Sequence, residues 1–190
     1  VTAGLAWVVV VAAEMIAGAD GLGFAILDAR NGLRTDLVVV GNVCTPDNPE
    51  ARAAIDGGLR YTSMPNAMAE YFCQERFPIM LTGTHGKTTC SSLTAWLLES
   101  AGHSPSFLIG GVPQNFGTSF QYGSGKEVVI EGDEYDTAFF EKTPKFLHYR
   151  AKAVLLGPIE FDHADIYHDL NAVKEAFQSL MVSLPRDALL

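Results

Sequence analysis

The amino-acid sequence predicts an α/β fold built on a parallel sheet. Short apolar runs alternate along the chain with segments whose apolar residues recur at helical spacing, and this order is typical of parallel sheets. The stretch 82–89, Thr-Gly-Thr-His-Gly-Lys-Thr-Thr, joins an apolar run to a helical segment. A glycine turn between a strand and a helix is typical of phosphate-binding loops, so the sequence also predicts a P-loop-type sheet.

The first elements are expected after a stretch that is hard to interpret. Residues 1–35 are rich in glycine and alanine without a clean period, and we predict no elements there. The β-branched run 37–40 predicts a strand, and 50–56 predicts a helix that ends at a pair of glycines. A short strand over 61–63 and a helix over 66–75 complete this part.

The strand and helix rhythm then restarts after Pro78. The run 78–81 predicts the strand that leads into the phosphate loop, and 89–101 predicts the helix that leaves it. Large apolar residues such as Trp96 recur along that helix, and we interpret Trp96 and Phe177 as packing residues. The remaining expected elements are strands over 106–109, 127–130 and 151–156 and a helix over 170–184.

Composition restricts the classes of partner. The chain of 190 residues has 13 Lys and Arg against 22 Asp and Glu, a net charge of −9, and no basic stripe. Nucleic acid and anionic membranes are therefore not expected as partners. Three scattered cysteines predict neither a disulfide framework nor a zinc site. The apolar run 6–13 is too short to span a bilayer and no basic residue precedes Arg30, so we expect a cytoplasmic protein.

The residues of the phosphate loop suit a nucleotide and its metal. Gly83 and Gly86 lack the Cβ that would block close approach of a phosphate. Lys87 can place its ammonium between two phosphates, and Thr88 can offer its hydroxyl to Mg²⁺. Leu81 stands where the usual pattern has its first glycine. The alternative is an ordinary helix N-terminus with an exposed lysine.

Acidic residues follow two further expected strands. Glu131 comes directly after the strand over 127–130, and Glu160 and His163 follow the strand over 151–156. Ligands of open parallel sheets bind at the carboxyl ends of the strands. If these strands are neighbours, Thr88 and Glu131 would ligate Mg²⁺ and His163 would lie close to a second metal position. Alternatively, 131–136 is a solvated acidic turn and His163 caps a turn or helix.

These stretches resemble the Mur ligases, ATP-dependent enzymes that add amino acids or peptides to UDP-N-acetylmuramate in bacteria. The matching stretches are 83–89, 110–117, 131–140 and 160–165. The resemblance implies that ATP contacts the loop residues Gly83, Thr84, His85, Gly86, Lys87, Thr88 and Thr89.

It also implies roles for single residues. Lys87, Glu131 and His163 would be catalytic, with Lys87 on the transferred phosphate. Thr88, Glu131 and His163 would be the metal ligands, while His85 and Asn115 would lie toward the muramoyl substrate.

Within the family, segments 135–140, 145–150 and 160–165 are most similar to the ligases of peptidoglycan recycling. Those enzymes join the tripeptide L-alanyl-γ-D-glutamyl-meso-diaminopimelate to UDP-N-acetylmuramate, whose carboxylate is first activated as an acyl phosphate. The alternatives are the ligase that adds L-alanine and a non-catalytic nucleotide-binding module.

The resemblance further implies a domain organisation. Residues 1–76 would be part of a Rossmann-like domain that binds the UDP-sugar, and 77–190 would be part of the central ATP-binding domain. The C-terminal domain of the family would be absent. We therefore expect an incomplete and inactive portion of a ligase.

Overall fold

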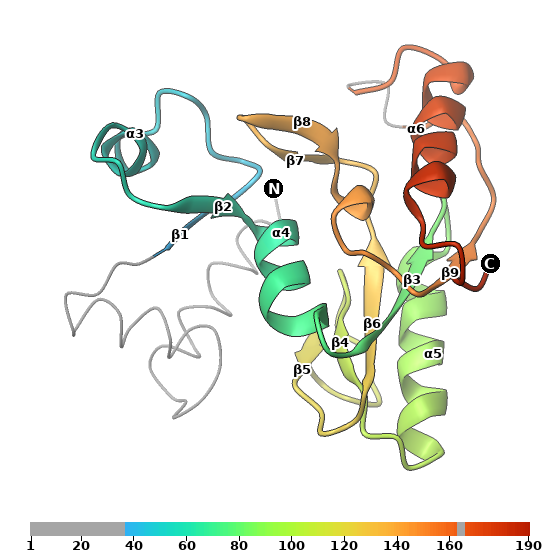
Figure 1. Cartoon of the computed structure of the whole chain (residues 1–190). Coiled ribbons are helices and arrows are strands. Elements are labelled where there is room, and N and C mark those ends of the chain that lie inside the picture. Colours follow the sequence, from blue (N-terminus) through green and yellow to red (C-terminus); the bar gives the residue numbers. More distant parts are fainter. Residues whose placement is uncertain (1–36, 163–165) are drawn as a thin grey trace. The chain divides into compact units, whose positions relative to one another are not determined.

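The computed structural model describes residues 37–162 and 166–190, and these form two compact units. The described part of the first unit comprises residues 37–63 with Ala138–Phe140, and the second comprises Met64–Thr137 and Glu141–Leu190 (Figure 1). The division of the chain into domains 1–76 and 77–190 stays a prediction. Residues 1–35, where no elements were predicted, lie outside the described residues.

The first unit is a β-α-β arrangement, in agreement with the sequence. Strands β1 (Val38–Val40) and β2 (Tyr61–Ser63) pair in parallel, and helix α3 (Pro49–Asp56) connects them. Asn48 caps this helix because its side-chain oxygen accepts hydrogen bonds from the first helical N–H groups. The helix ends at a turn in which Gly58 has a φ of +68°, a conformation that favours glycine.

The second unit is built on a sheet with the strand order β5-β4-β6-β3-β9. Strand β3 lies between β6 and β9 and is parallel to both, β4 continues the parallel set beside β6, and β5 is antiparallel to β4. The five strands are β3 (Phe77–Thr82), β4 (Ser106–Leu108), β5 (Phe120–Gln121), β6 (Glu127–Gly132) and β9 (Ala153–Leu156). The predicted parallel sheet is thus confirmed.

Two longer helices cover opposite faces of this sheet. On β3, Met80 faces a core that includes Phe177 of α6 (Leu170–Ser183), whereas Leu81 faces a second core that includes Ala95 of α5 (Lys87–Ser100). Successive side chains of a strand point to opposite faces, so one strand serves both cores. Phe177 is buried, as predicted.

Several shorter helices and strands lie between the strands of this sheet in the sequence or precede them. Helix α4 (Met64–Met68) continues as the π-helix η1 (Ala69–Cys73) and precedes β3. Strands β7 (Asp136–Ala138) and β8 (Glu141–Pro144) form a two-stranded sheet, followed by the 3₁₀ helix η2 (Lys145–Leu147). No helix within 37–162 or 166–190 is both long and apolar enough to span a bilayer.

The apolar stripe along α5 does not face the sheet. Leu93 and Leu97 are 56% and 59% exposed, whereas the residues of α5 that are buried are Ser91 and Ala95. Small side chains let the helix backbone lie close to the sheet, and this packing requirement outweighs the periodicity of the larger residues. Trp96 is 40% exposed but still packs edge-on against Phe116. The interpretation of Trp96 as a packing residue is therefore correct only in part.

Candidate active site

The phosphate loop connects the end of β3 to the start of α5, as the sequence predicted. Its two glycines, Gly83 and Gly86, have φ angles of +128° and +79°, which side chains of L-residues rarely adopt. At Gly83 an added Cβ would also lie 2.9 Å from Gly157 Cα, whereas at Gly86 it would meet nothing within 4 Å. The first glycine therefore allows close backbone packing, and the second leaves open space at the helix N-terminus.

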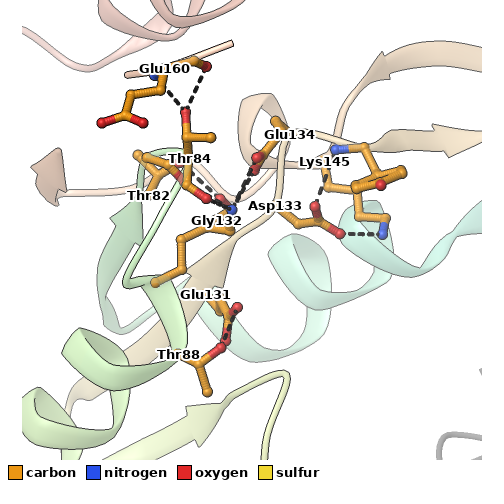
Figure 2. A network of polar contacts seen from close by, with 12 residues as sticks. Thr82, Thr84, Thr88, Glu131, Gly132, Asp133, Glu134, Lys145 and Glu160 are labelled. Carbon is orange, nitrogen blue, oxygen red and sulfur yellow. Dashed lines mark hydrogen bonds and ion pairs between the residues drawn. The ribbon is translucent and has the colours of Figure 1, made fainter. Parts of the chain in front are cut away.

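The chain that follows β9 holds the loop in place. Gly157 N–H donates to Thr82 O at 2.8 Å, and Thr84 N–H donates to Pro158 O at 2.8 Å. The Thr84 hydroxyl contacts both backbone groups of Glu160, accepting from N–H at 2.9 Å and donating to O at 3.1 Å (Figure 2). Two strand ends are thus tied together at one edge of the sheet.

Lys87, the first residue of α5, points back into this loop. Its Nζ donates to Gly83 O at 2.8 Å and to Thr84 O at 3.2 Å, and it lies 2.8 Å from Glu134 Oε2. The Lys87 side chain is 13% exposed. Lys87 is therefore not the exposed lysine that the alternative of an ordinary helix start assumed.

Glu131, near the end of β6, lies beside Thr88. Its Oε1 accepts a hydrogen bond from Thr88 Oγ1 at 2.9 Å, and its Oε2 accepts from Gly110 N–H at 2.8 Å (Figure 2). The carboxylate is thus oriented by α5 and by the loop after β4. A hydroxyl and a carboxylate side by side form an oxygen donor set of the kind that Mg²⁺ prefers. Neither here nor elsewhere in the described residues does a group of three His, Cys, Asp or Glu side chains form that could hold a metal ion.

The remaining predicted site residues that the structure describes are exposed side chains. His85 is 56% exposed, and its Nε2 lies 3.5 Å from Glu160 Oε2. Thr89 is an exposed residue in the first turn of α5, and Asn115 is exposed in the loop after β4. His163 lies outside the described residues, so its predicted position near a metal stays a prediction.

The acidic run after β6 is not a solvated turn throughout. Glu134 is 2% exposed and pairs with Lys87, and Asp133 Oδ2 lies 2.7 Å from Lys145 Nζ. Sequence reasoning singled out the run but assigned no partner to either residue. Nothing local identifies such partners, because both pairs join residues from different elements.

Burial also changes the pKa values of two tyrosines near this run. Burial, and then the neighbouring Glu134 carboxylate, raises the pKa of Tyr167 to about 12. Burial raises the pKa of Tyr149 as well, with a smaller contribution from Asp133. Both phenols are therefore neutral at physiological pH, and Tyr167 can donate its hydrogen bond to Glu134 O at 2.9 Å.

Comparison with known proteins identifies the family. A model of the Mur ligase middle domain matches residues 81–190. The chain belongs to the Mur ligases. The UDP-N-acetylmuramate–L-alanyl-gamma-D-glutamyl-meso-2,6-diaminoheptandioate ligase of Escherichia coli is 43% identical over 150 residues, which cover 79% of this chain and 33% of that Mur ligase. The UDP-N-acetylmuramate–L-alanine ligase of Renibacterium salmoninarum is 37% identical over 162 residues, or 85% of this chain and 33% of the relative.

A solved Mur ligase has the same fold. The crystal structure of the UDP-N-acetylmuramate:L-alanyl-gamma-D-glutamyl-meso-diaminopimelate ligase from Neisseria meningitides superposes with a TM-score of 0.76 at 42% identity. The match covers 83% of this chain and 52% of that one. The chain spans about a third of the length of the two curated Mur ligases described above.

Proposed function

We propose that this chain is part of an ATP-dependent ligase that joins L-alanyl-γ-D-glutamyl-meso-diaminopimelate to UDP-N-acetylmuramate in peptidoglycan recycling. The observation that supports a ligase site best is the strand order. β6 and β9 both pair with β3, so the phosphate loop and Glu131 lie at the same edge of one sheet. The greater identity to the tripeptide-named relative, 43% against 37%, favours the tripeptide as amine substrate.

The proposed reaction has two steps. The muramate carboxylate attacks the γ-phosphorus of ATP, the bond to ADP breaks, and an acyl phosphate forms. The tripeptide amine then attacks the acyl carbon, phosphate leaves, and the amine loses a proton as the amide forms. A free carboxylate is a poor acceptor for an amine because it is anionic and has no good leaving group, so the first step makes the second possible.

In this proposal the residues of the chain mainly bind and orient. Lys87 contacts the transferred phosphate, and the loop 83–89 binds the nucleotide through backbone N–H groups at the start of α5. Thr88 and Glu131 fit Mg²⁺, which takes few protein oxygens and completes its shell with water and phosphate. When bound, Mg²⁺ offsets negative charge on the transferring group. We also propose that His163 serves a second metal position and that His85 and Asn115 serve the muramoyl substrate.

A phosphate-release assay on the full-length protein tests this function. The protein receives ATP, Mg²⁺ and UDP-N-acetylmuramate, together with either L-alanine or the tripeptide. We expect release with the tripeptide. Release with L-alanine alone would show that the chain belongs to the L-alanine ligases, the second candidate that the Renibacterium relative supports. Nucleotide binding without release under either condition would indicate a non-catalytic module.

A further inference from the structure

The buried pair of Lys87 and Glu134 joins the phosphate loop to the acidic run after β6. Lys87 Nζ lies 3.0 Å from Glu134 Oε1 and 2.8 Å from Oε2, and the carboxylate is 2% exposed. The ammonium has three hydrogens, and its acceptors here are Gly83 O, Thr84 O and this carboxylate. The ammonium is therefore fully hydrogen-bonded by the protein itself, and Glu134 lies in the segment that directly follows β6 (Figure 2).

The segment that presents Glu134 is held on both sides. Thr82 Oγ1 donates to Gly132 O at 2.8 Å, and Lys145 pairs with Asp133 at 2.7 Å (Figure 2). On the far side, Tyr167 O–H donates to the backbone oxygen of Glu134 at 2.9 Å. Because these contacts restrain the backbone around Glu134, its carboxylate can hold the Lys87 ammonium in one position.

We propose that Glu134 is a positioning residue for Lys87. It holds the ammonium at the base of the phosphate loop before a nucleotide arrives, and so sets where the ammonium meets the transferred phosphate. The effect on turnover rests on the proposed ligase function, whereas the restraint on Lys87 is a property of the chain alone. A displacement of a catalytic group by about 1 Å can cost about a hundredfold in rate, so this restraint matters for turnover.

The negative charge of Glu134 makes it possible to distinguish a role in positioning Lys87 from a role in nucleotide binding. The Glu134 carboxylate repels the phosphates that Lys87 attracts, so its removal takes away a repulsion as well as a restraint. We therefore expect turnover to fall in Glu134→Ala while nucleotide affinity does not weaken. Glu134→Gln keeps an oxygen that can accept from Lys87, and it is expected to recover part of the lost rate.

The restraint itself can be measured without any turnover. Lysines of the full-length protein are labelled with acetic anhydride, and the labelled sites are quantified by mass spectrometry. We expect labelling of Lys87 to rise several-fold in Glu134→Ala. Asp133→Asn is the matched control, because Lys145 is 12% exposed and paired to the adjacent residue of the same run. That variant should raise labelling of Lys145 and leave labelling of Lys87 unchanged.

The kinetic arm uses phosphate release and the dissociation constant of a non-hydrolysable ATP analogue. In Glu134→Ala, kcat is expected to fall by about tenfold or more, with no rise in that dissociation constant. Glu134→Gln should lie between Glu134→Ala and wild type. Asp133→Asn, which also removes an ion pair from this run, should lower the melting temperature without reproducing the loss in kcat.

Three results would overturn the positioning role. One is unchanged labelling of Lys87 in Glu134→Ala, and another is an unchanged kcat in that variant. The third is an equal loss of kcat in Asp133→Asn with no recovery in Glu134→Gln, since this indicates a structural role only. A wild-type protein that releases no phosphate would contradict the proposed function instead, and the labelling would still decide whether Glu134 restrains Lys87.

Discussion

Glu131 offers a specific test of the magnesium assignment at the level of a single side chain. Its carboxylate is already oriented by Thr88 and Gly110, so Glu131→Gln removes charge while it keeps size and an oxygen. We expect the Mg²⁺ concentration for half-maximal turnover to rise by about tenfold or more, because neutral amides bind Mg²⁺ more weakly than carboxylates. The measurement is phosphate release over a range of Mg²⁺ concentrations.

Glu127 provides the control for that measurement. It lies at the other end of the same strand and contacts His103. Glu127→Gln should leave the Mg²⁺ dependence as in wild type. An unchanged dependence in Glu131→Gln would exclude Glu131 as a ligand.

Lys87 tests the phosphate loop itself. Lys87→Ala removes the only side-chain cation that the described structure places inside the loop, and we expect a loss of phosphate release of at least about a hundredfold. Lys142→Ala on β8 is the control, since the Lys142 side chain is 69% exposed. Retention of activity in Lys87→Ala would remove the basis for the assignment of this loop.

Sequence could nominate some of these residues and not others. Lys87, Thr88 and Glu131 were predictable because each follows an apolar strand, where ligand-binding groups gather in parallel sheets. Glu134 was not, because charges in an acidic run are usually solvated. The burial of Glu134 becomes visible only in the folded structure, where Lys87 and Tyr167, which are distant in sequence, contact it.

At the scale of the element, the phosphate loop contains two glycines with positive φ, and only Gly83 is also closely packed against backbone. Gly83→Ala would put a Cβ at a φ of +128° and 2.9 Å from backbone at Gly157, which cannot rotate away as a side chain could. We expect a loss of about 2 kcal/mol or more in the free energy of unfolding, from backbone strain and this contact together. Gly86→Ala has the strain without the contact, and a loss of about 1 kcal/mol is expected.

Urea denaturation of the two glycine variants compares these losses directly. The two sites lie three residues apart in the same loop, so differences in the unfolded chain are small. Equal losses in the two variants would contradict the argument that Gly83 is required for close packing against Gly157.

Elements differed in how far sequence could predict them. The strands of the parallel sheet were predicted because they are short apolar runs, and β4 and β6 are largely buried on both faces. Helix α5 was predicted, but its buried face was not, since the small residues Ser91 and Ala95 are the buried ones although larger apolar residues recur along the helix. The sheet of β7 and β8 was not predicted, because its two short strands include charged residues such as Glu141 and Lys142.

Strand order belongs to the whole second unit, and local patterns do not determine it. From the sequence, the ends of the strands over 78–81, 127–130 and 151–156 were expected to meet on the condition that these strands are neighbours in the sheet. β6 and β9 lie on either side of β3, so that condition holds.

The stability of the second unit should depend on the protonation of His148. In the neutral ring, Nδ1 donates to Asn66 Oδ1 and Nε2 accepts from the Thr143 hydroxyl, each at 2.9 Å, so His148 connects α4 to β8. Burial lowers the pKa of His148 below its ordinary value of 6.5, although the Glu141 carboxylate opposes this. The folded protein therefore takes up this proton at lower pH than the unfolded chain does.

It follows that stability is full above the ordinary pKa of histidine and falls as the pH drops through it, because the unfolded state then binds more protons. We expect His148 to make the free energy of unfolding lower at pH 5.5 than at pH 7.5. Urea denaturation at both values should show a smaller difference in His148→Gln. A larger pH effect in His148→Gln than in wild type would reverse the sign and contradict the argument.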